Sequence, residues 1–211
     1  MPRPRPTPLY HFTHVDNLPS IVTDGLLCEA ASTQRCVVEV GNRRIKEQRR
    51  RRPVRAGPGG SVGDYVPFYF APRSPMLYAV NAGQVEQYAG GQGPLVYLVT
   101  SVERLGDLGL SLVFTDRNAA LATGLVRFTS ALDDLDDLVD WPLMADALWF
   151  NTPDDPERRE RRMAECLAHG RVPWDGFTAV AATARMRTKV TEALARVGAH
   201  AQVEVRPKWY F

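Results

Sequence analysis

The chain has 211 residues, of which 45% are hydrophobic and 24% are charged, a balance typical of a soluble globular protein with one core. It contains no apolar run long enough to span a membrane, and its start, MPRPRPTPLY, has no apolar stretch after its charges. We therefore expect neither a membrane span nor a secretory signal, and predict a cytoplasmic protein without a membrane partner.

The cysteines and histidines argue against a disulfide framework and against a metal centre. Cys28, Cys36 and Cys166 show no CxxC spacing, which favours reduced thiols. The histidines show no HxxxH spacing. The sequence thus predicts no metal site.

The net charge is only +2, but its distribution is uneven. Segment 133–140 is rich in aspartate, whereas segment 43–55 is strongly basic. The basic residues are Arg43, Arg44, Lys46, Arg49, Arg50, Arg51, Arg52 and Arg55. A single basic segment in a chain of nearly neutral charge indicates that one surface of the protein binds an anionic partner.

The N-terminal part predicts a flexible lead, a strand and a helix. In residues 1–8, prolines alternate with arginine or threonine, which is typical of a flexible lead; residues 9–211 then form a single domain. Residues 9–14 predict a strand by alternation. Asp16 or Asn17 can cap a helix over 18–23 that stops at Gly25.

The middle of the chain begins with the basic segment, where residues 41–52 predict a helix or an ordered loop that ends at Pro53. Residues 65–71 predict a strand that sends Phe68 and Phe70 to one face and Tyr69 to the other. The next elements are a helix over 74–83, capped by Ser74, and a buried strand over 94–102.

The C-terminal half mixes short elements. A strand is expected over 112–115 and, after Asp116 as cap, a helix over 117–125; segment 128–150 has little regular pattern. A strand over 177–182, a helix over 184–197 and a final strand over 201–205 complete the list. Short, mixed elements predict an α+β fold rather than a doubly wound sheet.

Two generic catalytic motifs are missing: the chain has no P-loop and no GxGxxG after a strand. The GPGG at 57–60 lacks the lysine of a phosphate loop and is typical of a turn. The residues alone therefore lead no further than an α+β domain with a basic segment.

Several segments, in order along nearly the whole chain, resemble the DarT family. The longest are YHFTHVDNLPSIVTDGLL at 10–27, GNRRIKEQRRRRPV at 41–54, GDYVPFYFAPRSPMLY at 63–78 and RRMAECLA at 161–168. Shorter ones are FTDRNAA at 114–120, DWPLM at 140–144 and WYF at 209–211. The resemblance implies an ADP-ribosyltransferase-like fold, with a split central β-sheet flanked by helices that grips NAD in a cleft.

The resemblance also implies a function. Members of the family are NAD-dependent toxins that attach ADP-ribose to a base of single-stranded DNA, and a macrodomain antitoxin of the DarG type removes it. We therefore expect NAD as co-substrate, no metal, single-stranded DNA and such an antitoxin as partners, and a monomer. Thymine is the expected acceptor base, with guanine as the alternative.

The resemblance implies that Glu165 is the catalytic glutamate. The family motif is (R/Y)-Q-A-E-hydrophobic-L, and Met163 stands here where glutamine is usual. A carboxylate is needed to hold the ribose 2′-OH and stabilise positive charge at C1′ as nicotinamide leaves. From the residues alone, a solvated helical glutamate would be the better interpretation.

Arg49 matches the second catalytic residue of the family, an arginine that also positions NAD. A guanidinium suits this task because its fork grips phosphate in two places. The run of arginines leaves Arg50 and Arg51 as alternatives for this role, and we otherwise assign these two residues, with Tyr78, to DNA binding.

The resemblance places further residues around NAD. His14, and with less weight His11, match the first strand of the fold, and Tyr69 is expected to stack on the nicotinamide. The remaining expected contacts with NAD come from Thr13, Asn17, Gly25 and Leu26.

Other interpretations stay open. Segment 116–156 matches the family's substrate-recognition region, but its acidity argues against general attraction of DNA there. Among the aromatic residues, Trp141 and Trp149 suit the core better than a DNA surface. The acceptor could be RNA or protein, or the chain could be an inactive relative that only binds nucleic acid.

Overall fold

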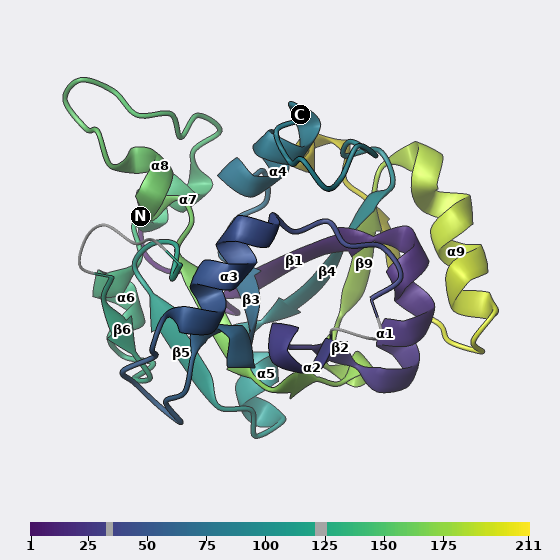
Figure 1. Ribbon diagram of the computed structural model, residues 1–211, viewed down its shortest axis with the longest axis horizontal. Helices are drawn as coiled ribbons and strands as arrows, with labels where there is room; N and C mark the ends of the chain where they lie inside the picture. The colour runs from purple at the N-terminus through teal and green to yellow at the C-terminus, as the bar shows by residue number, and fades with distance from the viewer. Residues whose placement is uncertain (33–35, 121–125) are drawn as a thin grey trace.

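The computed structural model describes residues 1–32, 36–120 and 126–211, which form a mixed α+β structure around a central sheet (Figure 1). The sheet order is β10-β9-β4-β1-β3-β7-β5-β6, and β2 pairs separately with β8. The strands are β1 Pro8–His14, β2 Leu26–Leu27, β3 Tyr65–Tyr69, β4 Leu95–Ser101, β5 Leu112–Thr115, β6 Phe128–Thr129, β7 Glu165–His169, β8 Arg171–Val172, β9 Ala179–Ala182 and β10 Val203–Val205. The helices are α1 Leu18–Asp24, α2 Glu29–Ser32, α3 Arg43–Arg51, α4 Pro75–Asn81, α5 Val102–Asp107, α6 Leu135–Leu138, α7 Trp141–Ala145, α8 Arg158–Arg161 and α9 Arg187–Ala195.

The sheet is split between β1 and β3. Strand β1 pairs with β4 along its whole length, but its register with β3 is a single pair, Tyr10 opposite Tyr69. The two halves, β10-β9-β4-β1 and β3-β7-β5-β6, therefore diverge on either side of this pair. This arrangement confirms the expected split central sheet.

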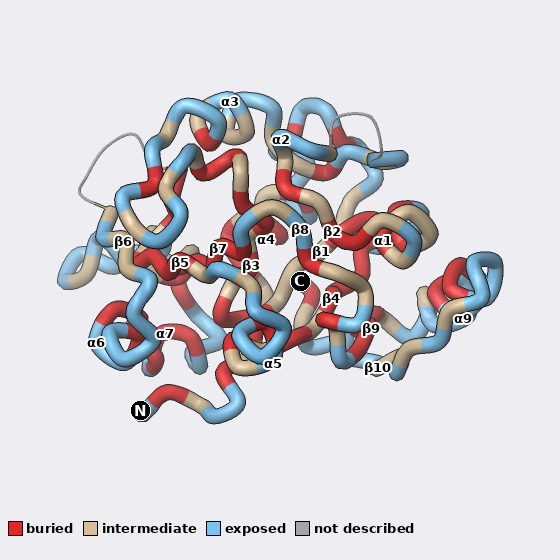
Figure 2. Tube along the Cα trace, turned by 90° about the horizontal axis from the view of Figure 1, so that it is seen from below, coloured by how far each residue is buried: buried red, intermediate tan, exposed pale blue. Residues whose placement is uncertain are grey.

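Buried residues gather in the strands of the sheet, as Figure 2 shows, and form the largest core cluster with α1, α5, α7 and α9. Phe68 and Phe70 lie in this core at 0% and 3% exposure, whereas Tyr69 points to the other face, so the predicted alternation is confirmed. Trp141 and Trp149 are also buried core residues, as expected.

The structure departs from one predicted helix. Residues 116–120 are not helical, and the rest of the predicted helix, 121–125, lies outside the described residues. Asp116 does not cap a helix there, because its carboxylate accepts a hydrogen bond from the Arg127 amide at 3.0 Å. The N-terminal lead packs against the domain: the Thr7 amide donates to Glu103 at 2.7 Å, and Arg3 donates to the Leu132 carbonyl at 3.0 Å.

Candidate active site

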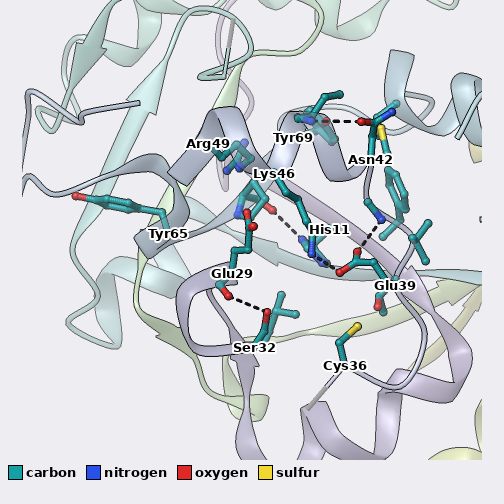
Figure 3. Close-up of a pocket in the computed structure, with 18 of the residues that line it drawn as sticks. His11, Glu29, Ser32, Cys36, Glu39, Asn42, Lys46, Arg49, Tyr65 and Tyr69 are labelled. Atoms are coloured by element: carbon teal, nitrogen blue, oxygen red, sulfur yellow. Dashed lines mark hydrogen bonds and ion pairs between the residues drawn. The ribbon is translucent and has the colours of Figure 1, made fainter. Parts of the chain in front are cut away.

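A cavity of about 400 Å³ lies where the sheet splits (Figure 3). Residues of β1 and β3 form its floor, and α1, α3, α4 and segment 36–42 surround it. Its lining includes His11, Thr13, Arg49, Tyr69, Met76 and Glu165.

Glu165 and Arg49 form a buried ion pair in this cavity. Arg49 Nη1 donates to Glu165 Oε1 at 3.0 Å and to Oε2 at 3.2 Å, and the two residues are 7% and 1% exposed. Burying a carboxylate costs several kcal/mol unless it is paired, so this pair holds both charges in place. Glu165 begins strand β7, opposite Tyr69 on β3, and the interpretation as a solvated helical residue is wrong.

Helix α3 brings Arg49 rather than its neighbours to the cavity. The Asn42 side chain caps the helix by accepting from the amides of Arg44 and Ile45. Ile45 and Arg49, four residues apart, share the face that lines the cavity. Arg50 is exposed and pairs with Glu29 at 2.7 Å, and Arg51 is also exposed.

The backbone of the segment after β5 also holds Glu165. The Ala119 amide donates to Glu165 Oε2 at 3.1 Å, and the Glu165 amide donates to Thr115 Oγ1 at 3.2 Å. The carboxylate therefore accepts from one charged side chain and one backbone donor, which fixes its orientation. The sequence does not signal Ala119, because only its backbone takes part.

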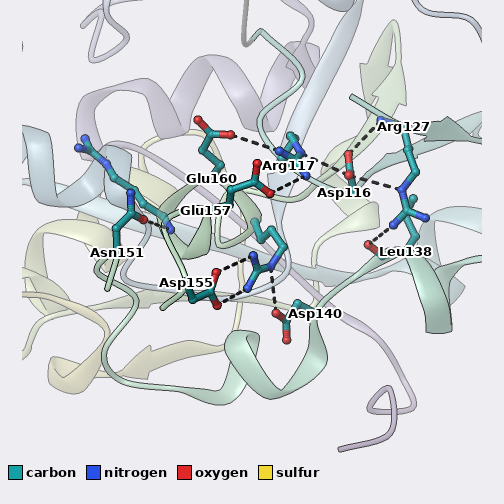
Figure 4. A network of polar contacts seen from close by, with 11 residues as sticks. Asp116, Arg117, Arg127, Leu138, Asp140, Asn151, Asp155, Glu157 and Glu160 are labelled. Carbon is teal, nitrogen blue, oxygen red and sulfur yellow. Dashed lines mark hydrogen bonds and ion pairs between the residues drawn. The ribbon is translucent and has the colours of Figure 1, made fainter. Parts of the chain in front are cut away.

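A network of ion pairs anchors this segment (Figure 4). Arg117 lies 3.3 Å from Asp116, 3.6 Å from Glu157 and 3.3 Å from Glu160. Arg127 adds a second contact to Asp116 at 3.4 Å. The network ties the end of β5 to α8, and α8 leads directly into Glu165.

Arginines pair with several acids of segment 116–156, which the sequence marks as unfavourable for DNA. Arg161 pairs with Asp140 at 3.1 Å and with Asp155 at 2.7 Å, and Arg158 pairs with Asp146 at 2.9 Å. Four of the five aspartates in segment 133–140 are exposed, so this part of the surface keeps its acidic character.

The first strand places His11, and not His14, among the described residues that line the cavity. Burial lowers the pKa of His11 to about 4, so its ring is neutral at physiological pH, and Nδ1–H donates to the Pro67 carbonyl at 2.8 Å across the split. The His14 ring accepts from the Asp16 amide at 3.2 Å and packs against Tyr88. His11, rather than His14, thus lies in the cavity, and the expected contacts of both histidines with NAD remain predictions.

Tyr69 lies next to the ion pair, in the wall of the cavity. Burial and the nearby Glu165 charge raise the pKa of its hydroxyl, so it stays protonated at neutral pH. Thr13 of β1, which the resemblance assigns to NAD binding, also lines the cavity.

Asn17 occupies the N-cap position of α1, but its side chain makes no capping hydrogen bond and instead links β1 to segment 36–42. Its amide nitrogen donates to Thr13 Oγ1 at 3.0 Å and to the Val38 carbonyl at 2.9 Å, and its oxygen accepts from the Val38 amide at 2.9 Å. These bonds fix the wall formed by segment 36–42. Gly25 has φ 81°, and a Cβ there would lie 2.7 Å from the Val172 carbonyl oxygen, so only glycine fits at this position. Gly25 and the next residue, Leu26, both line the cavity.

The residues expected to bind DNA lie outside the lining of the cavity. Arg50 and Arg51 project from α3, and Tyr78 packs edge-on against Trp149, Phe150 and Phe211. No group of three histidine, cysteine or carboxylate side chains suited to a metal occurs among the described residues, and no helix there is long and apolar enough to cross a membrane.

Arg162 is a structural residue that the sequence does not single out. Burial lowers the pKa of its guanidinium to about 10. It donates to the carbonyls of Leu143 at 2.6 Å, Asp146 at 2.7 Å and Pro72 at 2.8 Å. These bonds join the segment after β3 to α7, close in sequence to Glu165.

Comparison with known proteins identifies the family. A family model described as "DarT: ssDNA thymidine ADP-ribosyltransferase, DarT" matches residues 10–211. The chain belongs to the DarT family. It is 38% identical to a DNA ADP-ribosyl transferase of Thermus sp. (strain 2.9), over 99% of this chain and 98% of that protein.

Solved structures of DarT from Thermus sp. 2.9 are similar over the whole chain. The complex with ADP-ribosylated ssDNA matches with a TM-score of 0.91 and 39% identity over 100% of both chains. The complex with NAD+ matches with a TM-score of 0.85 and 38% identity over 99% of both chains. A relative in Thermosipho africanus, 26% identical over 78% of this chain and 39% of its own length, is a fusion of DNA ADP-ribosyl transferase and DNA ADP-ribosyl glycohydrolase.

Proposed function

We propose that this chain transfers ADP-ribose from NAD to thymine in single-stranded DNA, with Arg49 and Glu165 as the catalytic pair. The observation that carries the assignment is the buried Arg49–Glu165 ion pair in a 400 Å³ cavity at the split of the sheet. Family membership supplies the reaction class, and the cavity supplies a site of suitable size and chemistry.

The donor set fits a dinucleotide. Arg49 Nη2 is buried without a hydrogen-bond partner, so the guanidinium keeps a donor for an oxygen of a bound ligand. Backbone at Thr13, the neutral His11 ring and Tyr69 line the same cavity and suit the nicotinamide end, whereas Gly25 and Leu26 suit a close backbone approach. NAD supplies the ADP-ribosyl group, with nicotinamide as the leaving group.

Each catalytic residue has a separate task. The Glu165 carboxylate holds the ribose hydroxyl and stabilises positive charge at the reacting carbon. Arg49 fixes the carboxylate and stabilises the negative charge that develops on thymine as N3 bonds to the ribose carbon that nicotinamide leaves and gives up its proton to water. Glu165 can hold the ribose hydroxyl only while Arg49 and the Ala119 amide orient its carboxylate.

The biological setting follows the relatives. The fusion of transferase and glycohydrolase in Thermosipho africanus supports a toxin whose modification a DarG-type macrodomain partner removes. A cytoplasmic location and a monomer, with single-stranded DNA as the acceptor, complete the proposal. RNA and protein are the alternative acceptors to be tested.

Replacement of the carboxylate tests the catalytic assignment. We expect Glu165→Ala to lower transfer to a thymine-containing oligonucleotide by roughly a hundredfold or more, because it removes one transition-state contact. The control is Glu47→Ala, which removes an exposed carboxylate of α3. Full transfer by a folded Glu165→Ala protein would exclude Glu165 as the catalytic residue.

A further inference from the structure

An exposed aromatic ring lies on segment 146–157. Phe150 is 49% exposed, and beneath it Trp149 is 1% exposed. The two rings lie 4.6 Å apart between centroids at an interplanar angle of 30°, so one side of Phe150 covers Trp149. The remaining surface of the Phe150 ring is open to solvent.

Two more rings and a cation extend the cluster that Phe150 and Trp149 begin. Tyr78 meets Phe150 edge-on at 5.8 Å and Phe211 at 5.2 Å. The Arg73 guanidinium lies 4.6 Å from the Phe211 ring centroid, and its Nε is buried without a hydrogen-bond partner. We call Trp149, Phe150, Tyr78 and Phe211 the aromatic platform.

Two elements connect the aromatic platform to the lining of the active-site cavity. Tyr78 belongs to α4, and Met76 of the same helix lines the cavity. On the other side, the Asn151 side chain accepts from the Arg159 amide at 2.8 Å, and Arg159 also lines the cavity. Phe150 therefore lies on a segment that is hydrogen-bonded to the lining of the cavity that the target base would enter.

We propose that Phe150 stacks on a base next to the target base, which makes the aromatic platform a second contact site for the DNA strand. This inference rests on the proposed function. A stacking ring beside cationic groups is the usual means of holding a single strand without reading its sequence, since every base has a flat face. Arg73 and Arg159 supply the positive charge that phosphates require.

Binding of a short single-stranded oligonucleotide with one thymine, measured by fluorescence anisotropy without NAD, tests the proposal. We expect Phe150→Ala to weaken binding roughly 5- to 100-fold, the range for loss of one stacked base, and Phe150→Trp to bind as well as the unchanged protein. The matched control is Leu148→Ala, since Leu148 is 67% exposed on the same segment and makes no ring contact in the platform. Affinity for NAD should be unchanged in all three variants.

An abasic scan identifies the partner of the ring. In the unchanged protein, an abasic site at one neighbour of the thymine should weaken binding, and in Phe150→Ala the same change should have little further effect. Equal binding by Phe150→Ala, or a scan without a sensitive neighbour, would overturn the inference and leave a protein partner as the use of this surface. Transfer to the oligonucleotide by the unchanged protein, measured in parallel, shows independently whether the proposed function holds.

Discussion

At the scale of single residues, the site is built from a contact between positions 116 residues apart, Arg49 and Glu165. The family motif identified Glu165, but its strand position and burial could not be read from the polar sequence around it. Among the arginines of α3, only the three-dimensional structure distinguishes the one that meets Glu165. The same holds for His11 and His14, because alternation along a strand does not show which face meets a cavity.

The forked shape of the guanidinium is the property that Arg49 contributes. Arg49→Lys keeps a positive charge but offers no planar pair of donors for Glu165 and a second oxygen. We expect the rate of transfer to fall by about 100-fold, with the protein still folded, when measured by the ADP-ribose mass gained by an oligonucleotide. The matched control, Arg43→Lys, changes an exposed residue of the same helix. Unchanged transfer by Arg49→Lys would show that charge alone is enough.

At the scale of elements, periodicity and capping residues located the larger pieces correctly. The sequence correctly predicts strand β1, the buried strand β4 and helix α4, which Ser74 caps. The helix expected after β5 is absent over residues 117–120, because contacts with more distant residues decide this segment: the Ala119 amide donates to Glu165, and the Asp116 carboxylate accepts from the Arg127 amide. Local preference for a helix cannot reveal such partners.

The ion-pair network of Arg117 should act through the position of Glu165. Arg117→Ala frees the segment whose Ala119 amide holds the carboxylate, so we expect kcat to fall by roughly tenfold, about 1.4 kcal/mol, with little change in the KM for NAD. Arg117→Lys should restore part of the rate. The matched control is Arg206→Ala, which breaks an ion pair with Glu204 on β10. Equal losses in Arg117→Ala and Arg206→Ala would contradict a positioning role.

At the scale of the whole molecule, the split of the sheet is what creates the site. Composition and pattern predict an α+β fold, but the division between β1 and β3 was expected only from the family resemblance. The net charge of +2 likewise says little about the surface, because Arg158 and Arg161 pair with acids of segment 140–155, whereas most aspartates of segment 133–140 stay exposed. Folding therefore decides which charges remain available to an anionic partner.

The most direct test of the central claim follows the acceptor base. The purified protein is incubated with NAD and four single-stranded oligonucleotides, each lacking a different base, and the products are weighed by mass spectrometry. We predict that three oligonucleotides gain one ADP-ribose and that the one without thymine gains none. Loss of the gain only without guanine would correct the base, and no gain on any DNA, with transfer to RNA or protein instead, would contradict the proposed function.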